Sequence, residues 1–396
     1  MLTFVYNTSV FREKLRFLFV FPFLASALSG CAGSKAATGP VFFPPAPNPP
    51  RVQYLMKISD SQDIEDKKSS FSLFVQKSLE GDTVKPIKKP YGVTTRNGKI
   101  YICDVGGATV SIIDPPRKTF EYLKGNFSVG KLKKPINIAV DGEGAMYIAD
   151  IERKEILVYD AAGNFKNAFG KELDMKPTDV AVDGKYLYVV DIGHSEVKVL
   201  DSKTGKLLDR IGKGSEQSEG LALPTNFAVD GKGFIYVTNT MTGKVMKFDR
   251  DGHLLLSFGK LGDGFGQFGR PKGVAVDDAG RIYVADSAHQ NVQIFNDKGR
   301  LLMFFGDPGT APEGTMNLPS SVAVSRDNLD YFQKFADPSF QLENVIFVIN
   351  QYGPNKVAVY GLGQQKSALD DVKVVQEGSD GTKELQKKAE AGQEKK

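Results

Sequence analysis

The sequence predicts an all-β fold, a six-bladed β-propeller of four-stranded antiparallel blades. First, a proline recurs every 42 to 48 residues, at Pro90, Pro135, Pro177, Pro224, Pro271 and Pro319. Second, short apolar segments separated by Gly- and Asp-rich turns follow each proline, as expected for one blade per repeat. Third, the second segment of every repeat carries an aromatic residue in the same register, within IYICD, MYIAD, LYVVD, IYVTN, IYVAD and IFVIN.

The order of the segments also predicts how the ring closes. Four repeats end in a fourth segment, NAFG, DRIG, LSFG or MFFG, but the sixth stops after VAVYG at residues 357–361. Arg51–Ser59 precedes the first repeat, and its apolar residues alternate with mostly polar ones, the period of a half-buried strand. We therefore expect this segment to supply the outer strand of blade six, which avoids an unpaired strand edge.

The repeat resembles a known family. Residues 271–306, PKGVAVDDAGRIYVADSAHQNVQIFNDKGRLLMFFG, resemble the NHL repeat, and the likeness extends over about 51–361. The resemblance implies the propeller but not one activity, because related propellers include scaffolds, RNA binders and enzymes. NHL-like lyases hold zinc with histidines at the central channel, and no histidine begins an innermost strand here. The resemblance therefore does not extend to a zinc lyase.

The N-terminus reads as an export signal. A basic segment precedes the 12 apolar residues 17–28, too few for a membrane-spanning helix, which needs about 20. The following LSGC at 28–31 resembles the bacterial lipobox, which implies a signal peptide over 1–30 and diacylglyceryl lipidation of Cys31. Ala32 in place of Asp implies export to the outer membrane, facing the periplasm or the cell surface. A plain signal peptide with an incidental cysteine is the alternative.

Two further segments fall outside the predicted propeller. Residues 31–50 would form a lipidated, Pro-rich tether without strand period, extended as polyproline II. Residues 362–396 would form a charged, disordered tail.

Composition restricts the function classes. A net charge of +4 in 396 residues argues against a nucleic-acid partner. Two cysteines and three histidines exclude a disulfide framework and a Cys-rich metal site, and Cys103 should be a buried free thiol.

The titratable residues of the repeat are expected to be structural. His194 and His289 share a repeat position in blades too far apart for a common metal, and His253 lies at the opposite end of its blade. The recurrent Asp141, Asp183, Asp230 and Asp277, and the aspartates that end the second strands, should accept backbone N–H bonds at turns. GDGFGQFG at 262–269 should connect two blades, because a strand rather than a helix follows it.

Three polar residues stand where other repeats have glycine near the start of the innermost strand: Asn137, Asp179 and Asn226. They come from adjacent blades and face one sector of the channel mouth, so they are candidate ligand-binding residues. They could equally be strand caps. Lactonase-type propellers hold calcium there with oxygen ligands, but three residues with one charge fall short of the six to eight oxygens that calcium prefers.

Two segments depart from the repeat. Ser325–Asn344 replaces the short hairpin of blade six and holds Tyr331, Phe332, Phe335 and Phe340, which we expect to bury on the propeller. Tyr331, Phe332 and Phe335 are the candidate partner-binding residues. Residues 69–80 could form a short amphipathic helix against the rim.

The sequence thus favours a membrane-anchored, non-catalytic scaffold that binds a protein or peptide and needs no cofactor or metal. The alternative is a calcium-dependent hydrolase or lactonase with its site at the channel mouth.

Overall fold

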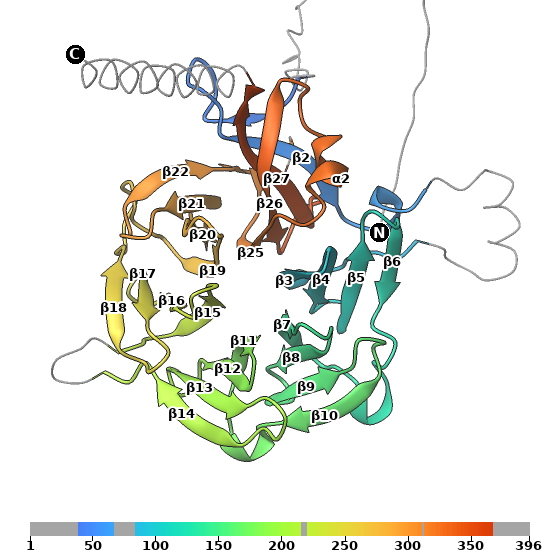
Figure 1. Ribbon diagram of the computed structural model, residues 1–396, viewed down its shortest axis with the longest axis vertical. Coiled ribbons are helices and arrows are strands. Elements are labelled where there is room, and N and C mark those ends of the chain that lie inside the picture. The colour runs from blue at the N-terminus through green and yellow to red at the C-terminus, as the bar shows by residue number, and fades with distance from the viewer. Residues whose placement is uncertain (1–38, 67–83, 215–219, 311–312, 367–396) are drawn as a thin grey trace, which may run out of the picture. The chain divides into compact units, whose positions relative to one another are not determined.

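The computed structural model describes residues 39–66, 84–214, 220–310 and 313–366, all within one compact unit, Gly39–Lys396. The predicted signal peptide, Cys31, the 69–80 segment and the tail beyond 366 lie outside the described residues. Six antiparallel sheets surround a central channel, so the six-bladed propeller is confirmed (Figure 1).

Blades one to three each take four consecutive strands in chain order. Blade one holds β3 (Pro90–Arg96), β4 (Lys99–Asp104), β5 (Thr109–Asp114) and β6 (Thr119–Tyr122). Blade two holds β7 (Pro135–Val140), β8 (Met146–Asp150), β9 (Glu155–Tyr159) and β10 (Phe165–Phe169). Blade three holds β11 (Pro177–Asp183), β12 (Tyr186–Asp191), β13 (Glu196–Asp201) and β14 (Leu207–Ile211).

Blades four and five repeat this arrangement. Blade four holds β15 (Pro224–Val229), β16 (Ile235–Asn239), β17 (Lys244–Phe248) and β18 (Leu254–Phe258). Blade five holds β19 (Pro271–Val276), β20 (Ile282–Asp286), β21 (Asn291–Phe295) and β22 (Leu301–Phe305). Every first strand begins with its proline, whose missing N–H is tolerated at the first residue of a strand.

Blade six closes the ring with strands from both ends of the described chain. Its order is β25 (Pro319–Ser325), β26 (Phe340–Asn350), β27 (Val357–Gln365), β2 (Val52–Ile58) and β1 (Phe42–Phe43). β2 pairs antiparallel with β27, from Val52 opposite Leu362 to Ile58 opposite Val357. The predicted N-terminal closing strand is therefore confirmed.

The fifth strand, β1, corrects the expectation that 31–50 contains no strand. Phe42 and Phe43 pair with β2, and Phe43 is only 7% exposed, with its ring 6.3 Å from those of Phe305 and Tyr360. Burying a phenylalanine contributes about 2 to 3 kcal/mol, which outweighs the preference of the flanking prolines for an extended, solvated chain. β27 also continues four residues past the predicted end of the propeller at 361.

The remaining elements connect or extend the blades. They are η1 (Ser61–Asp63), η2 (Ser128–Gly130), η3 (Lys171–Leu173), α2 (Leu329–Gln333), and the parallel pair β23 (Asp307–Pro308) and β24 (Thr315–Met316). No described helix is long and apolar enough to cross a membrane.

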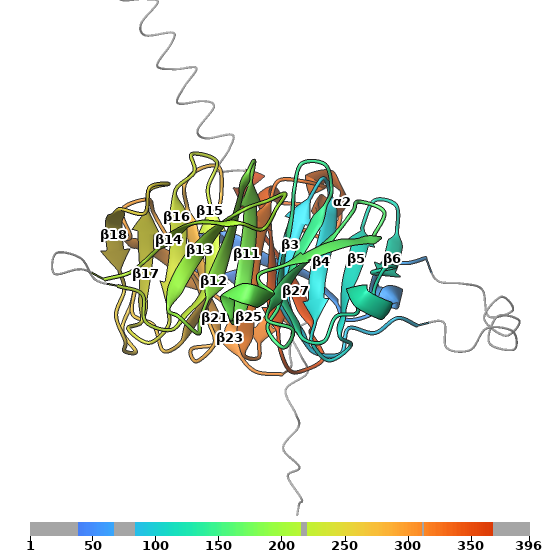
Figure 2. The ribbon, with the colours of Figure 1, turned by 90° about the horizontal axis from the view of Figure 1, so that it is seen from below.

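The strands run between two faces (Figure 2). We name the face at which each first strand begins the proline face, and the face at which it turns into the second strand the hairpin face. α2 lies between β25 and β26 and so belongs to the hairpin face.

The core lies between neighbouring blades. One cluster joins Tyr101 and Cys103 of blade one to Ile138 and Ile148 of blade two, and equivalent clusters join the other neighbours. Cys103 is a free, fully buried thiol as predicted, and burial raises its pKa well above the usual value.

The residue that ends the second strand of each blade anchors the loop entering that blade. These six strand-end residues are at most 1% exposed: Asp104, Asp150, Asp191, Asn239, Asp286 and Asn350. The carboxylate of Asp150 accepts the backbone N–H groups of Lys133 and Lys134, just before the proline, and those of Glu152 and Arg153 in the next turn. The predicted capping role is confirmed.

Ring closure gives the first prediction. Val52→Asp places a carboxylate at a fully buried position of β2, and we expect it to lower the free energy of unfolding by about 3 kcal/mol or more. Lys57→Glu, at an exposed position of the same strand, should change it by less than about 0.5 kcal/mol. Urea unfolding followed by circular dichroism measures both. Equal midpoints for the two variants would contradict a closing role for β2.

Candidate functional site: the central channel

The first strands of all six blades line a cavity of about 280 Å³ along the propeller axis. Asn137, Asp179 and Asn226 all line it, as the sequence predicts, and Ser321 of blade six joins them. Each of the three predicted residues is the third residue of its strand and is at most 9% exposed.

Hydrogen bonds of these side chains join neighbouring blades at three of the six junctions, two–three, three–four and six–one. Asn137 Nδ2 donates to the carbonyl of Thr178 at 2.9 Å. Asp179 Oδ2 accepts the backbone N–H of Phe227 at 3.0 Å, and its Oδ1 accepts its neighbour's N–H at 2.8 Å. Ser321 Oγ accepts the N–H of Val93 across the junction of blades six and one, at 3.3 Å. The polar layer therefore acts as a belt around the channel, as strand caps would.

Glycine completes this layer where space is lacking. A Cβ on Gly92 would lie 1.8 Å from Asn137 Oδ1, and one on Gly273 would lie 2.5 Å from the Cα of Ser321. Since real Cβ atoms do not approach so closely, Gly92 leaves room for the side chain of Asn137 in blade two, and Gly273 leaves room for the backbone of blade six at Ser321.

Asp179 is the one acid of the belt. Burial raises its pKa to about 7, although hydrogen bonds from Phe227, Val180 and Asn226 oppose the shift. Two buried acceptors nearby, Asn226 Oδ1 and Thr178 Oγ1, have no hydrogen-bond partner in the described part of the chain. The channel is thus lined by acceptors and holds a carboxyl group that titrates near neutrality.

The belt does not fit calcium. Calcium takes six to eight oxygen ligands. Both oxygens of Asp179 already accept backbone N–H bonds, and Asn137 Oδ1 faces the backbone of blade one at Gly92. The remaining side-chain acceptors are too few to complete a coordination shell.

A second polar cluster was not anticipated from the sequence. Lys198 of β13 is fully buried, and its Nζ lies 2.7 Å from Asp191 Oδ2 and also bonds Glu196 Oε1. Arg210 bonds the same oxygen of Glu196, and His194 Nδ1 lies 2.6 Å from Asp191 Oδ2. The position is occupied by Ser111, Leu157 or Met246 in other blades, so only the alternation of charge in EVKVLD could have signalled it.

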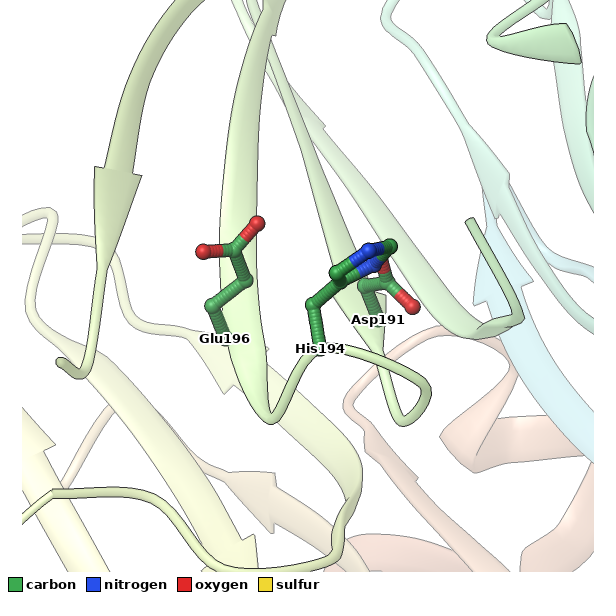
Figure 3. A group of neighbouring side chains, drawn as sticks. All are labelled: Asp191, His194 and Glu196. Atoms are coloured by element: carbon green, nitrogen blue, oxygen red, sulfur yellow. The ribbon is translucent and has the colours of Figure 1, made fainter. Parts of the chain in front are cut away.

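Figure 3 shows Asp191, His194 and Glu196, whose ligand atoms all lie within 4.8 Å of one another, the spacing of a metal site. However, the ammonium group of Lys198 bonds both carboxylates and occupies the place of a cation. Burial would raise the pKa of Asp191, but hydrogen bonds from Lys198, Lys176 and His194 lower it below its usual value. The cluster is therefore a buried ion network rather than a metal centre.

The other histidines also bond acids of their own turns. His289 Nδ1 lies 3.0 Å from the strand-end Asp286, and His253 Nδ1 lies 3.0 Å from Asp249. Asp249 also accepts the backbone N–H groups of Asp251 and His253, so this exposed group is a turn.

The recurrent aspartates at the turn after the first strand cap this turn in three of the four blades that carry one. Asp141, Asp230 and Asp277 each accept two backbone N–H groups of the following turn. Asp183 instead pairs with Arg250 at 2.9 Å. Its hairpin has only two residues between β11 and β12, too few to fold back onto the carboxylate.

The structure divides the predicted partner-binding residues. Phe332 is 1% exposed and packs 5.6 Å from Phe347, so it cannot contact a partner, which corrects that assignment. Tyr331 is partly buried and Phe335 is 40% exposed, with ring centroids 5.6 Å apart. Phe332 and Phe340 are buried as expected, since the insert forms α2 and the start of a lengthened β26.

Comparison with known families agrees with this architecture. The NHL repeat pattern matches residues 268–295, the unit that begins at β19. The chain contains an NHL repeat. No curated protein matches it.

Solved structures of similar fold are propeller proteins. One is a Bacteroides thetaiotaomicron protein of unknown function, with TM-score 0.54 and 17% identity over 78% of this chain and 75% of that one. Another is an auxiliary nutrient binding protein from the same organism, with TM-score 0.52 and 13% identity over 72% and 71%. A Xanthomonas campestris gluconolactonase has TM-score 0.50 and 16% identity over 84% and 99%. At these identities the likeness shows the fold alone.

The ion network gives the second prediction. Lys198→Met leaves Asp191 and Glu196 without their buried cation, and we expect a loss of about 3 to 5 kcal/mol in the free energy of unfolding at pH 7. Arg210→Met, whose side chain is 38% exposed, should cost about 1 kcal/mol. The deficit of Lys198→Met should shrink at acid pH, where protonation of Asp191 removes the buried charge that Lys198 no longer neutralises. A rise in the wild-type melting temperature with added Zn²⁺ would contradict the network.

The third prediction concerns Asp179. Its folded pKa of about 7 exceeds the unfolded value of 3.8, so its stabilising contribution is complete below about pH 4 and is lost as pH rises through 7. Relative to the wild type, the free energy of unfolding of Asp179→Asn should therefore rise by about 4 kcal/mol between pH 4 and pH 8. Asp160→Asn is the control, because the pKa of Asp160 is lowered to about 2 and only the acid limb should change. Parallel wild-type and Asp179→Asn curves would refute the assignment.

Proposed function

We propose that the chain is an exported lipoprotein, held on a membrane by lipid on Cys31, whose propeller is a non-catalytic scaffold for a protein or peptide. The sequence pattern at 1–31 supports the anchor and an outer-membrane location. The first described residue, Gly39, lies eight residues after Cys31, so a lipidated chain would hold the propeller close to the bilayer.

The observation that carries the scaffold role is the aromatic pair Tyr331 and Phe335 on the hairpin face. Phe332 and Phe340 fix the insert in the core between blades six and one. Asn328 Nδ2 donates to the carbonyl of Gly98 at 2.5 Å, and Gly98 donates its N–H to Asp327 Oδ2 at 2.9 Å. The exposed rings are thus presented rigidly, and rigid aromatic anchors favour binding at a low entropic cost.

The titratable side chains also support binding rather than catalysis, because their hydrogen bonds and ion pairs within the propeller already engage them. The strand-end aspartates, three of the four turn aspartates and all three histidines form hydrogen bonds or ion pairs within their own blade, and the fourth turn aspartate, Asp183, pairs with Arg250 of the next blade. One propeller of similar fold is called an auxiliary nutrient binding protein, which is compatible with this role at the level of fold.

A calcium-dependent hydrolase is the second candidate, favoured by the unpartnered Asn226 Oδ1 on the channel wall and by the gluconolactonase of similar fold. The occupied oxygens of Asp179 weigh against it. A calcium-dependent rise in melting temperature that Asp179→Asn abolishes would favour the hydrolase over the scaffold.

The fourth prediction tests the anchor. In cells fed an alkyne fatty acid, Cys31→Ala should lose the label and leave the membrane fraction, because no acceptor thiol remains at the lipobox. Cys103→Ala, which removes the buried thiol, should keep both. Equal labelling of wild type and Cys31→Ala would exclude lipidation at this residue.

The partner surface is tested by placing a photo-crosslinking amino acid at Phe335. Irradiation of cells should give one discrete crosslinked species, identified by mass spectrometry. The matched position is Leu208 on β14, which is 46% exposed on the far side of the ring from blade six, and should give none. Identical products at both positions, or none at Phe335, would exclude this docking surface.

A further inference from the structure

The proline face carries a group of cations where blades five, six and one meet. Lys272 is the second residue of β19, Arg270 directly precedes that strand, and Lys89 directly precedes β3. In the described part of the chain, none of the three forms an ion pair with a carboxylate.

Lys272 is the unusual member because it is buried. Its residue is 7% exposed, and its Nζ contacts Tyr91, with 3.1 Å to the hydroxyl and 4.8 Å to the ring centroid. Burial, and then repulsion from Arg270, lower its pKa to about 8. An ammonium group has three donors, and this hydrogen bond uses one of them.

A second pair of the same kind lies beside it. Lys89 Nζ is 3.0 Å from the hydroxyl of Tyr352 and 4.9 Å from its ring centroid, on the turn between β26 and β27. Lys89, Tyr352 and Arg270 are exposed, whereas Lys272 and Tyr91 lie deeper. Arg270 lies close enough to influence the pKa of both Lys272 and Tyr91, and Lys89 lies two residues before Tyr91 in the chain, so the two lysine–tyrosine pairs belong to the same end of the channel.

The acids nearest in the chain bond backbone N–H groups rather than the side chains of these cations. Asp104 directs its carboxylate to the backbone N–H groups of Lys88 and Lys89, and Asp286 to those of Gly269 and Arg270. Asp179 lies close enough to influence the pKa of Tyr91, but its oxygens bond the backbone of blades three and four. None of these carboxylates bonds Lys272, whose pKa is lowered by burial and by the neighbouring cation Arg270.

We propose that the cluster formed by Lys89, Arg270, Lys272, Tyr91 and Tyr352 binds an oxyanion, a carboxylate or phosphate group of a ligand that approaches the proline face. An oxyanion would give Lys272 a charged partner in a partly desolvated place, where such hydrogen bonds are strong. The guanidinium of Arg270 suits the same group because it offers paired donors. This site is independent of the hairpin-face scaffold and of lipidation.

The experiment uses inorganic phosphate as the probe on the full chain. Melting temperature and isothermal titration are measured in phosphate and in chloride of equal ionic strength. We expect saturable, phosphate-specific stabilisation of the wild type, and at least about a tenfold loss of affinity in Lys272→Met. Because this variant removes a buried, uncompensated cation, it should melt above the wild type without phosphate, which separates lost binding from failure to fold.

The matched control is Lys185→Met. Lys185 also lies over a tyrosine, with its Nζ 4.9 Å from the ring of Tyr186, but on the hairpin face. The Lys185→Met variant should bind phosphate with the affinity of the wild type. Equal stabilisation by chloride and phosphate, or an equal loss in both variants, would overturn the proposal.

Vesicles distinguish the source of the anion. Binding to phosphatidylglycerol but not phosphatidylcholine vesicles, lost in Lys272→Met, would support the site and assign the oxyanion to a lipid headgroup. Phosphate binding without vesicle binding would support a soluble ligand. Vesicle binding that Lys272→Met leaves intact, together with no phosphate binding, would overturn it.

Discussion

The propeller depends on one repeated contact, the buried carboxylate or amide at the end of each second strand. It accepts N–H groups from residues just before the proline-led first strand of the same blade, which fixes the loop arriving from the previous blade. Proline itself has no N–H, and these donors lie one or two residues before it. A buried acceptor and a buried donor are each costly without a partner. The same residue also accepts N–H bonds from the following turn in several blades, and thereby holds the proline face together.

The polar belt of the channel uses the same kind of side-chain to backbone hydrogen bond, but between neighbouring blades. Asn137, Asp179 and Ser321 reach the backbone of a neighbouring blade, and Thr240 and Ser287 donate to the carbonyls of Pro271 and Pro319. These bonds link neighbouring blades, which share no backbone ladder. The polar residues at the axis therefore have a structural role. A ligand that bound at the belt would have to displace hydrogen bonds between blades.

The two surfaces that we propose for binding lie at the two ends of the channel and differ in chemistry. The hairpin face presents the aromatic insert of blade six, and the proline face presents cations beside tyrosines. Both lie next to blade six, the blade that the N-terminal strands complete. A chain tethered from its N-terminus would therefore hold both surfaces near the place of attachment, since β1 and β2 end the blade that carries the insert.

The sequence by itself determined the repeat, the blade count, the closing strand and the structural role of the aspartates, because strand period, turn chemistry and proline positions are local properties. It also placed Asn137, Asp179 and Asn226 at one level of the channel, since equal register in adjacent repeats fixes equal height. Only the tertiary structure decided that Phe332 is buried while Phe335 is exposed, that Phe43 packs on Phe305, and that Lys198 neutralises two acids. Lys272 and Tyr91 are 181 positions apart and meet only when the ring closes. Such pairings depend on which side chains face each other across blades, a property that no single segment of the sequence contains.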